Sequence, residues 1–123
     1  MQNVLGVTIK TLRLDNNSSN LLKISINESW NLYELIITTD VATYIGYIIC
    51  SSANLSYNPS YKKIYESGES GVSTSFYKDN SNNLFVKINT GSYGARIICK
   101  SKTGSIPYLS VQSSTDTSSL TNL

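Results

Sequence analysis

The chain has 123 residues, a length that predicts one domain with a core of its own. Its formal net charge of +2 at pH 7 is too small for a nucleic-acid partner. Charged residues make up only 15% of the chain, whereas Ser, Thr and Asn together supply 45 of the 123 residues, so hydroxyls and amides make the surface polar. No apolar run reaches the roughly 18 residues of a transmembrane helix, which predicts no insertion into a membrane.

The first half of the chain alternates between apolar runs and polar loops. The runs predict strands at 4–14, 21–27, 32–39 and 43–51, and the polar stretches predict loops at 15–20 and 52–60. In the second strand Leu22, Ile24 and Ile26 share one face, as expected for a strand with one buried side. The third and fourth runs are almost continuously apolar, which is typical of central strands covered on both faces.

The second half contains the clearest local signal, a β-hairpin at 72–89. Its sequence is VSTSFYKD, then NSNN, then LFVKIN, and Leu84, Val86 and Ile88 point one way while Lys87 points the other. Further strands are predicted at 61–66, 93–100 and 106–112, with turns at 67–71, 90–92 and 102–104.

These elements predict an all-β fold, because no long segment has a helical stripe with caps. Eight to nine short strands separated by turn residues are typical of an antiparallel β-sandwich, and a jelly-roll-like sandwich is the architecture we expect. The expected domain spans residues 1–112. Residues 113–123 are expected to form a polar C-terminal tail that is either frayed or docked.

The two cysteines leave two alternatives open. Cys50 and Cys99 each end an apolar strand, so they are either two buried free thiols or a disulfide, if the two strand ends lie together. The N-terminal sequence MQNVLGVTIK lacks the basic and long apolar regions of a signal peptide. We therefore expect assembly in a reducing cytoplasm, which favours free thiols.

Catalysis and cofactor binding are disfavoured by composition, because the chain has no histidine. This excludes Ser-His-Asp and Cys-His nucleophiles and His-ligated metals, and two cysteines cannot complete a four-thiolate zinc site. We expect a non-enzymatic protein with no catalytic residue, no metal and no cofactor.

The carboxylates are expected to serve turns. Glu66 and Glu69 flank a glycine in a loop, but nothing in their spacing indicates the paired carboxyls of a glycosidase. The runs 15–17 and 79–82 each bring one carboxylate beside Asn and Ser, too few for a calcium site, so we interpret them as turns. The same interpretation applies to Asp40 and Asp116.

Tyrosines near loops are the best candidates for binding. The ligand-binding residues we predict are Tyr57, Tyr61, Lys62 and Tyr93. Binding surfaces favour Tyr with small polar residues because Tyr gives a large rigid contact area at low entropy cost. The alternative is that each Tyr is simply a good strand residue with its hydroxyl at the rim. Trp30 is predicted to anchor the core or a subunit interface.

The segment 75–88, SFYKDNSNNLFVKI, resembles a recurring stretch near the C-termini of bacteriophage tail fibres and tailspikes. In those proteins one strand ends with an aromatic residue, Tyr, a basic residue and Asp. A turn of Ser, Gly or Asn follows, and the next strand begins with Leu or Val, an aromatic residue, Val and Lys. The run 30–37, WNLYELII, and the His-free, Ser/Asn/Thr/Tyr-rich composition are similar to the same distal domains. The resemblance covers residues 21–112.

The resemblance implies a small β-sandwich head domain that assembles as a homotrimer and binds a host-surface glycan or protein receptor. Its implied location is the phage virion, with other tail proteins as further partners and with the host cell surface as its site of action. Two alternatives remain open. One is a structural virion protein for capsid decoration or tail assembly, and the other is a free-standing carbohydrate-binding module.

The apolar content also predicts an oligomer. The segment 32–50 is apolar on two faces, and monomers rarely expose a large contiguous apolar patch. Assembly with closed symmetry would cover the second face.

Overall fold

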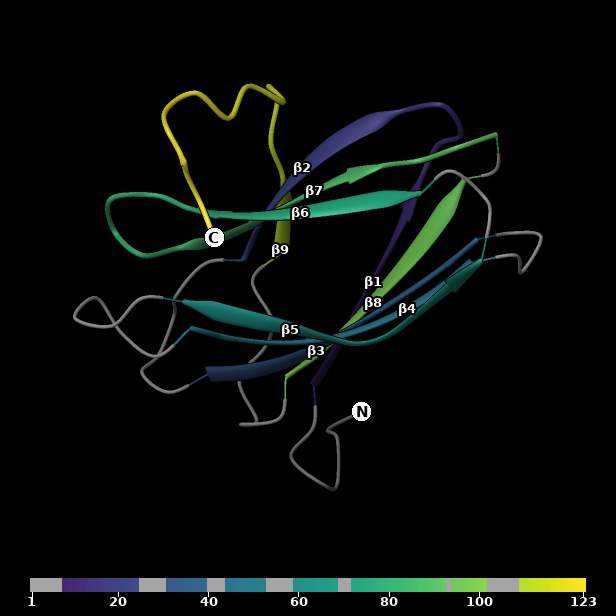
Figure 1. The fold of residues 1–123 in the computed structure, drawn as a ribbon, viewed down its shortest axis with the longest axis horizontal. Coiled ribbons are helices and arrows are strands. Elements are labelled where there is room, and N and C mark those ends of the chain that lie inside the picture. The colour runs from purple at the N-terminus through teal and green to yellow at the C-terminus, as the bar shows by residue number, and fades with distance from the viewer. Residues whose placement is uncertain are drawn as a thin grey trace.

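A computed structural model describes residues 8–24, 31–39, 44–52, 59–68, 72–92, 94–101 and 109–123. Within these ranges the chain is all-β, with no helix and with two antiparallel five-stranded sheets packed face to face (Figure 1). The predicted antiparallel β-sandwich is therefore confirmed. The described residues form ten strands, one more than the upper end of the expected range, because the two-residue β10 lies in the segment predicted as a polar tail.

The first sheet has the order β1-β8-β3-β4-β5, and the second has the order β10-β6-β7-β2-β9. The first contains β1 (Thr8–Leu14), β3 (Asn31–Thr39), β4 (Tyr44–Ser52), β5 (Ser60–Gly68) and β8 (Ala95–Ser101). The second contains β2 (Ser19–Ile24), β6 (Ser73–Lys78), β7 (Leu84–Asn89), β9 (Leu109–Val111) and β10 (Thr121–Asn122).

The chain crosses between the sheets after β1, β2, β5, β7 and β8. Repeated crossing of this kind is the jelly-roll-like feature of the fold. In contrast, β3, β4 and β5 follow one another within one sheet, so that β3 and β4 are central strands, as their apolar sequences predict. The predicted hairpin is formed by β6 and β7, which pair from Ser73 opposite Asn89 to Lys78 opposite Leu84.

The core lies between the sheets and follows the two-residue period of the strands. On β3, Tyr33, Leu35 and Ile37 are fully buried, and they belong to one cluster with the inward residues of the second sheet. Those residues are Leu22, Ile24, Phe76, Leu84, Val86 and Ile88. Burial of one such aliphatic side chain contributes about 1.5–3 kcal/mol, so this cluster accounts for much of the stability of the sandwich.

The predicted loop at 15–20 is shorter in the structure, because β2 begins at Ser19. Asn17 adopts a left-handed conformation with φ of 50°, and Asn is one of the few residues that tolerate this region. The hydroxyl of buried Thr90 accepts a hydrogen bond from the Ser18 N–H at 2.8 Å and donates to the Asp15 carbonyl at 2.7 Å. These hydrogen bonds close the turn within four residues, so that Ser19 can begin β2.

The cysteines lie on strands that are not neighbours. Cys50 in β4 is opposite Tyr33, and Cys99 in β8 is opposite Leu35, so that β3 runs between them. Neighbouring strands are about 4.8 Å apart, so two strands separated by a third are about 9.6 Å apart. A disulfide needs its two Cα atoms within about 7 Å. Cys99 is a buried free thiol, and the alternative of a disulfide between the two strand ends is wrong.

The C-terminal segment is docked on the outer face of the second sheet rather than frayed. It leaves β9 with a hydrogen bond from the Gln112 N–H to the Leu21 carbonyl at 2.8 Å, and it ends in β10, which pairs with β6. The Leu123 N–H then donates to the Phe76 carbonyl at 2.9 Å, and the Leu123 side chain packs against the core. In Figure 1 this segment arches above β2 and β7.

One inward-facing hydroxyl lacks a partner and yields a stability prediction. The Thr74 Oγ1 atom is buried without a hydrogen bond to any described residue, and an unsatisfied buried hydroxyl costs about 1–3 kcal/mol. Replacing it with the isosteric valine, Thr74→Val, is expected to raise the free energy of unfolding by about 1 kcal/mol. Urea denaturation measures this difference, with Ser73→Ala on the exposed position beside it as control. A loss of stability would contradict the burial of this hydroxyl.

Candidate functional site

The sequence-predicted binding residues are only partly within the described structure. Tyr57 and Tyr93 lie outside the described residues, so their roles stay predictions. Tyr61 is half-buried, and its ring stacks on Phe76 with centroids 4.0 Å apart and an interplanar angle of 15°. Lys62, the next residue of β5, is exposed. The ring of Tyr61 therefore packs inward between the sheets. Lys62, in contrast, is accessible to solvent.

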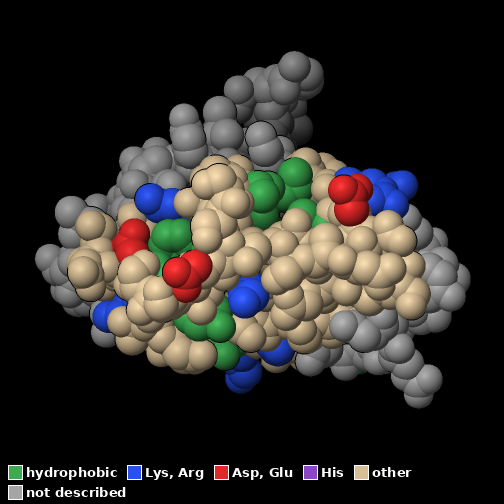
Figure 2. All heavy atoms as spheres, turned by 90° about the horizontal axis from the view of Figure 1, so that it is seen from above, with side chains coloured by type: hydrophobic (Ala, Val, Ile, Leu, Met, Phe, Trp, Pro, Cys, Tyr) green, Lys and Arg blue, Asp and Glu red, His purple; other side chains and the backbone are tan. Residues whose placement is uncertain are grey.

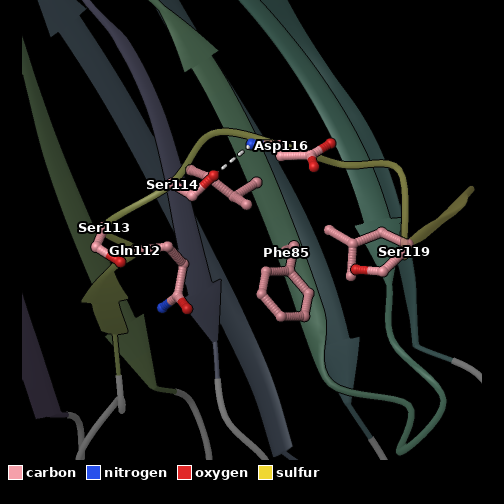
Figure 3. Close-up of a pocket in the computed structure, with 8 residues that line it drawn as sticks. Phe85, Gln112, Ser113, Ser114, Asp116 and Ser119 are labelled. Carbon is pink, nitrogen blue, oxygen red and sulfur yellow. Dashed lines mark hydrogen bonds between the residues drawn. The ribbon is translucent and has the colours of Figure 1, made fainter.

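A cleft with a mixed polar and apolar lining lies among the described residues, and sequence reasoning missed it. It has a volume of about 240 Å³ and lies between the outer face of the second sheet and the C-terminal segment. Its lining residues are Leu21, Phe85, Gln112, Ser113, Ser114, Asp116, Ser119 and Leu120. We call it the segment cleft. Figure 3 shows the ring of Phe85 at its centre, with residues of the C-terminal segment around and above it.

The floor of the segment cleft is apolar and its walls are polar. Leu21 and Phe85 point to the outer face of the sheet, yet they are only 3% and 6% exposed because the C-terminal segment covers them. Most of the walls come from hydroxyl, amide and carboxyl side chains of that segment, and Leu120 adds an apolar part. Seen from the side of this segment, the surface is mostly uncharged and polar, with small hydrophobic areas between scattered charges (Figure 2).

Asp116 supplies the carboxylate of the cleft. Its Oδ1 accepts a hydrogen bond from the Ser118 N–H at 2.9 Å, and its Oδ2 lies 3.1 Å from the Ser118 hydroxyl. These two bonds, with a smaller contribution from the charge of Lys87, hold the pKa of Asp116 below its usual value. The Asp116 N–H in turn donates to the Ser114 hydroxyl at 3.1 Å (Figure 3). The carboxylate is therefore charged at neutral pH and fixed in place.

Two lysines flank the cleft on the sheet side. The Lys23 Nζ atom lies 5.8 Å from the centroid of the Phe85 ring, a cation–π distance. Lys87 is opposite Leu21 in the β2–β7 register, and both lysines are half-buried. The cleft thus joins an apolar floor, one carboxylate and two nearby ammonium groups.

Asp79 and Asp15 lie at turns, as predicted, whereas Glu66, which was expected in a loop, lies within β5. Asp79 accepts hydrogen bonds from the Ser81 and Asn83 N–H groups, each at 2.9 Å, and so closes the β6–β7 hairpin. Asp15 lies 4.0 Å from Arg13 on the exposed surface. No group of three metal-ligating side chains occurs among the described residues, and the same residues include no helix long and apolar enough to cross a membrane.

Cys99 is expected to be chemically inert in the folded protein. Its side chain is fully buried, and this burial raises the pKa of its thiol to about 12. Because the thiolate is the nucleophile, a Cys50→Ser variant should react with a disulfide reagent only after unfolding in guanidinium. Thiol release is followed by absorbance. Rapid reaction of the native variant would contradict the burial of Cys99.

The outer face of the first sheet carries an apolar row. The register places Ile98, Ile36, Tyr47 and Tyr65 side by side across β8, β3, β4 and β5. Of these, Ile36 and Ile98 are half-buried and the side chain of Tyr65 is 56% exposed. We call this line of residues the outer row. No described segment of the chain covers it in the way that the C-terminal segment covers the second sheet.

Charged residues border the outer row. The neighbouring line across the same strands contains Lys100, Glu34 and Lys62, and the line on the opposite side contains Arg96. An apolar centre with a polar and charged rim is the usual composition of a protein–protein interface.

Comparison with known proteins yields no relative. No protein-family model matches the sequence, and no curated protein or solved structure matches it either.

Proposed function

We propose that this domain is the head domain of a bacteriophage tail fibre or tailspike, which binds a host-surface receptor without enzymatic activity and assembles as a homotrimer. The observation that carries the proposal is the outer row, an apolar strip that the described chain leaves partly open. The β6–β7 hairpin adds support because it contains the segment on which the sequence resemblance rests. In the virion the domain would contact other tail proteins at one end and the receptor at the other.

Self-association explains the outer row better than exposure to water does. An apolar line bordered by Lys100, Glu34 and Arg96 contains charges of both signs, so copies of the same surface can face one another without strong repulsion. Homo-oligomers with closed symmetry cover such patches on every subunit. The net charge of +2 is small enough to allow close approach of three copies.

The solution mass tests the assembly. Light scattering over a dilution series should give a trimer for the natural sequence, and Ile36→Lys should shift it to monomer because the ammonium group would be desolvated in the interface. Val111→Lys is the matched control, since Val111 is 51% exposed on the second sheet and its replacement should leave the trimer intact. A natural chain that is monomeric at micromolar concentration would overturn the homotrimer.

Receptor binding is tested separately with a panel of bacterial cells and their purified surface polysaccharides. The proposal expects saturable binding without release of new reducing ends. Binding to virions or capsids but not to cells would instead favour the structural virion protein, which the outer row also accommodates. A monomer that binds polysaccharide would favour the free-standing carbohydrate-binding module, for which the segment cleft is the supporting observation.

A further inference from the structure

The segment cleft is an opening that the C-terminal segment forms and does not fill. The segment lies on Leu21 and Phe85 closely enough to bury both, yet it leaves a volume of about 240 Å³ beside them. Pockets for drug-sized ligands measure about 300–1,000 Å³. The segment cleft is therefore suited to a smaller unit, of about the size of one six-membered ring with its substituents.

The lining selects the chemistry of that unit. A hydrophobic ligand would meet mostly polar walls. A phosphate would touch the charged carboxylate of Asp116, whereas Lys23 and Lys87 only flank the cleft and are not among its lining residues. A ring with an apolar face and several hydroxyls suits both parts of the site, because its face can touch the small part of Leu21 and Phe85 that remains exposed while its hydroxyls reach the walls. A pyranose has this combination.

Hydrogen-bonding groups in the walls remain available to such a ligand. Gln112 donates through Nε2 to Ser110 at 3.2 Å, which fixes the amide and leaves its Oε1 as an acceptor. The hydroxyls of Ser113 and Ser119 form no hydrogen bond within the described part of the chain and are exposed. Each Asp116 oxygen has a second lone pair beyond the one that Ser118 occupies.

We propose that the segment cleft binds one pyranose unit of a glycan, with Leu21 and Phe85 beneath the ring and Asp116 and Gln112 accepting hydrogen bonds from its hydroxyls. A hydrogen bond to an ionised carboxylate is about twice as strong as a neutral one, so Asp116 is the principal polar contact. This inference rests on the proposed function for the source of the glycan, a host surface, and it places the sugar on the second sheet rather than beside Lys62.

The test uses the full chain and four probes: the methyl glycosides of glucose, galactose and mannose, and N-acetylglucosamine. Each is titrated into ¹⁵N-labelled protein to about 100 mM, which detects a Kd in the millimolar range. We expect saturable shifts of the amide signals of Gln112, Ser113, Asp116 and Ser119 with at least one sugar. Absence of shifts at these residues with all four sugars would overturn the inference.

Variants separate a specific contact from a general surface effect. Asp116→Asn keeps an acceptor for the Ser118 N–H but removes the charge, and it should weaken sugar binding about tenfold. Asp15→Asn is the matched control, because Asp15 is likewise an exposed loop aspartate, and it should change nothing. Amide spectra of the free variants report whether the C-terminal segment is still docked. Equal affinity of a docked Asp116→Asn and the natural protein would overturn the role of the carboxylate.

The two proposals fail in different ways. A trimer that binds cells or polysaccharide but shows no sugar-dependent shifts at the segment cleft retains the proposed function and loses this inference. A monomer that binds no cells but binds a pyranose at the segment cleft, with the Asp116→Asn effect, retains this inference and loses the tail-fibre function.

Discussion

Replacing Phe76 with alanine is expected to lower the free energy of unfolding by about 3–5 kcal/mol. The Phe76 ring is 1% exposed in the core, and its removal leaves a cavity between the sheets that the surrounding strands cannot fully close. It also removes the ring on which Tyr61 of β5 stacks at 4.0 Å. Because β5 is at the edge of the first sheet and β6 is in the second, this ring pair joins the two layers. Equilibrium unfolding in urea, followed by fluorescence, measures the change.

Two further variants divide the Phe76 effect into its parts. Phe76→Leu keeps most of the buried volume but also removes the stacked ring, so it should cost about 1–3 kcal/mol, less than Phe76→Ala. Tyr61→Leu leaves the core residue in place but removes the stacked pair, which should cost about 0.5–1.5 kcal/mol beyond the change in buried area. A loss below about 1 kcal/mol for Phe76→Ala would contradict the burial of this ring.

Adding a single methyl group at Gly94 is expected to destabilise the domain by about 2–3 kcal/mol. Gly94 is buried just before β8, and a Cβ atom there would lie 2.7 Å from the Leu14 carbonyl oxygen and 2.8 Å from both terminal nitrogens of Arg13. The carbonyl belongs to the backbone of β1, so relief requires a shift of the Leu14–Ala95 pair at the end of the β1–β8 ladder. Thermal unfolding of Gly94→Ala measures the loss.

The same substitution in an Arg13→Ala background identifies the obstacle. The Arg13 side chain is flexible and half-exposed, whereas the Leu14 carbonyl is fixed in the strand. We therefore expect Gly94→Ala to remain destabilising by a similar amount when the guanidinium is absent. Ser92→Ala, an exposed position in the same connection, should change stability by less than about 0.5 kcal/mol. A neutral Gly94→Ala in the Arg13→Ala background would show that the side chain alone causes the clash.

Strand identity and facing were predictable because they depend on a local period. The alternation of Leu84, Val86 and Ile88 assigns them to one face of a strand, and all three are fully buried in the structure. The hairpin followed from its turn residues in the same way. The order of strands was not predictable, since the pairing of β1 with β8 joins residues more than eighty positions apart and no local pattern encodes it.

The candidate site was harder to predict than the fold. Leu21 and Phe85 stand on the side of their strands that the alternation assigns to solvent, and only the docked C-terminal segment buries them. That segment has no apolar period, so its sequence predicts a polar tail. The tyrosine-rich loops gave the stronger compositional signal, but the one described tyrosine among the predicted ligands, Tyr61, packs against Phe76. Gln112 and Asp116 line the same cleft only because the C-terminal segment folds back over the second sheet.

The position of β8 between β1 and β3 has a consequence for synthesis on the ribosome. Until residues 95–101 have emerged, β1 has no partner and one edge of β3 is open, although both strands were made much earlier. An open apolar edge is a template for pairing with other chains. We therefore expect slow folding, in the range of milliseconds to seconds that non-local β pairing imposes, and aggregation of nascent chains that are truncated before β8.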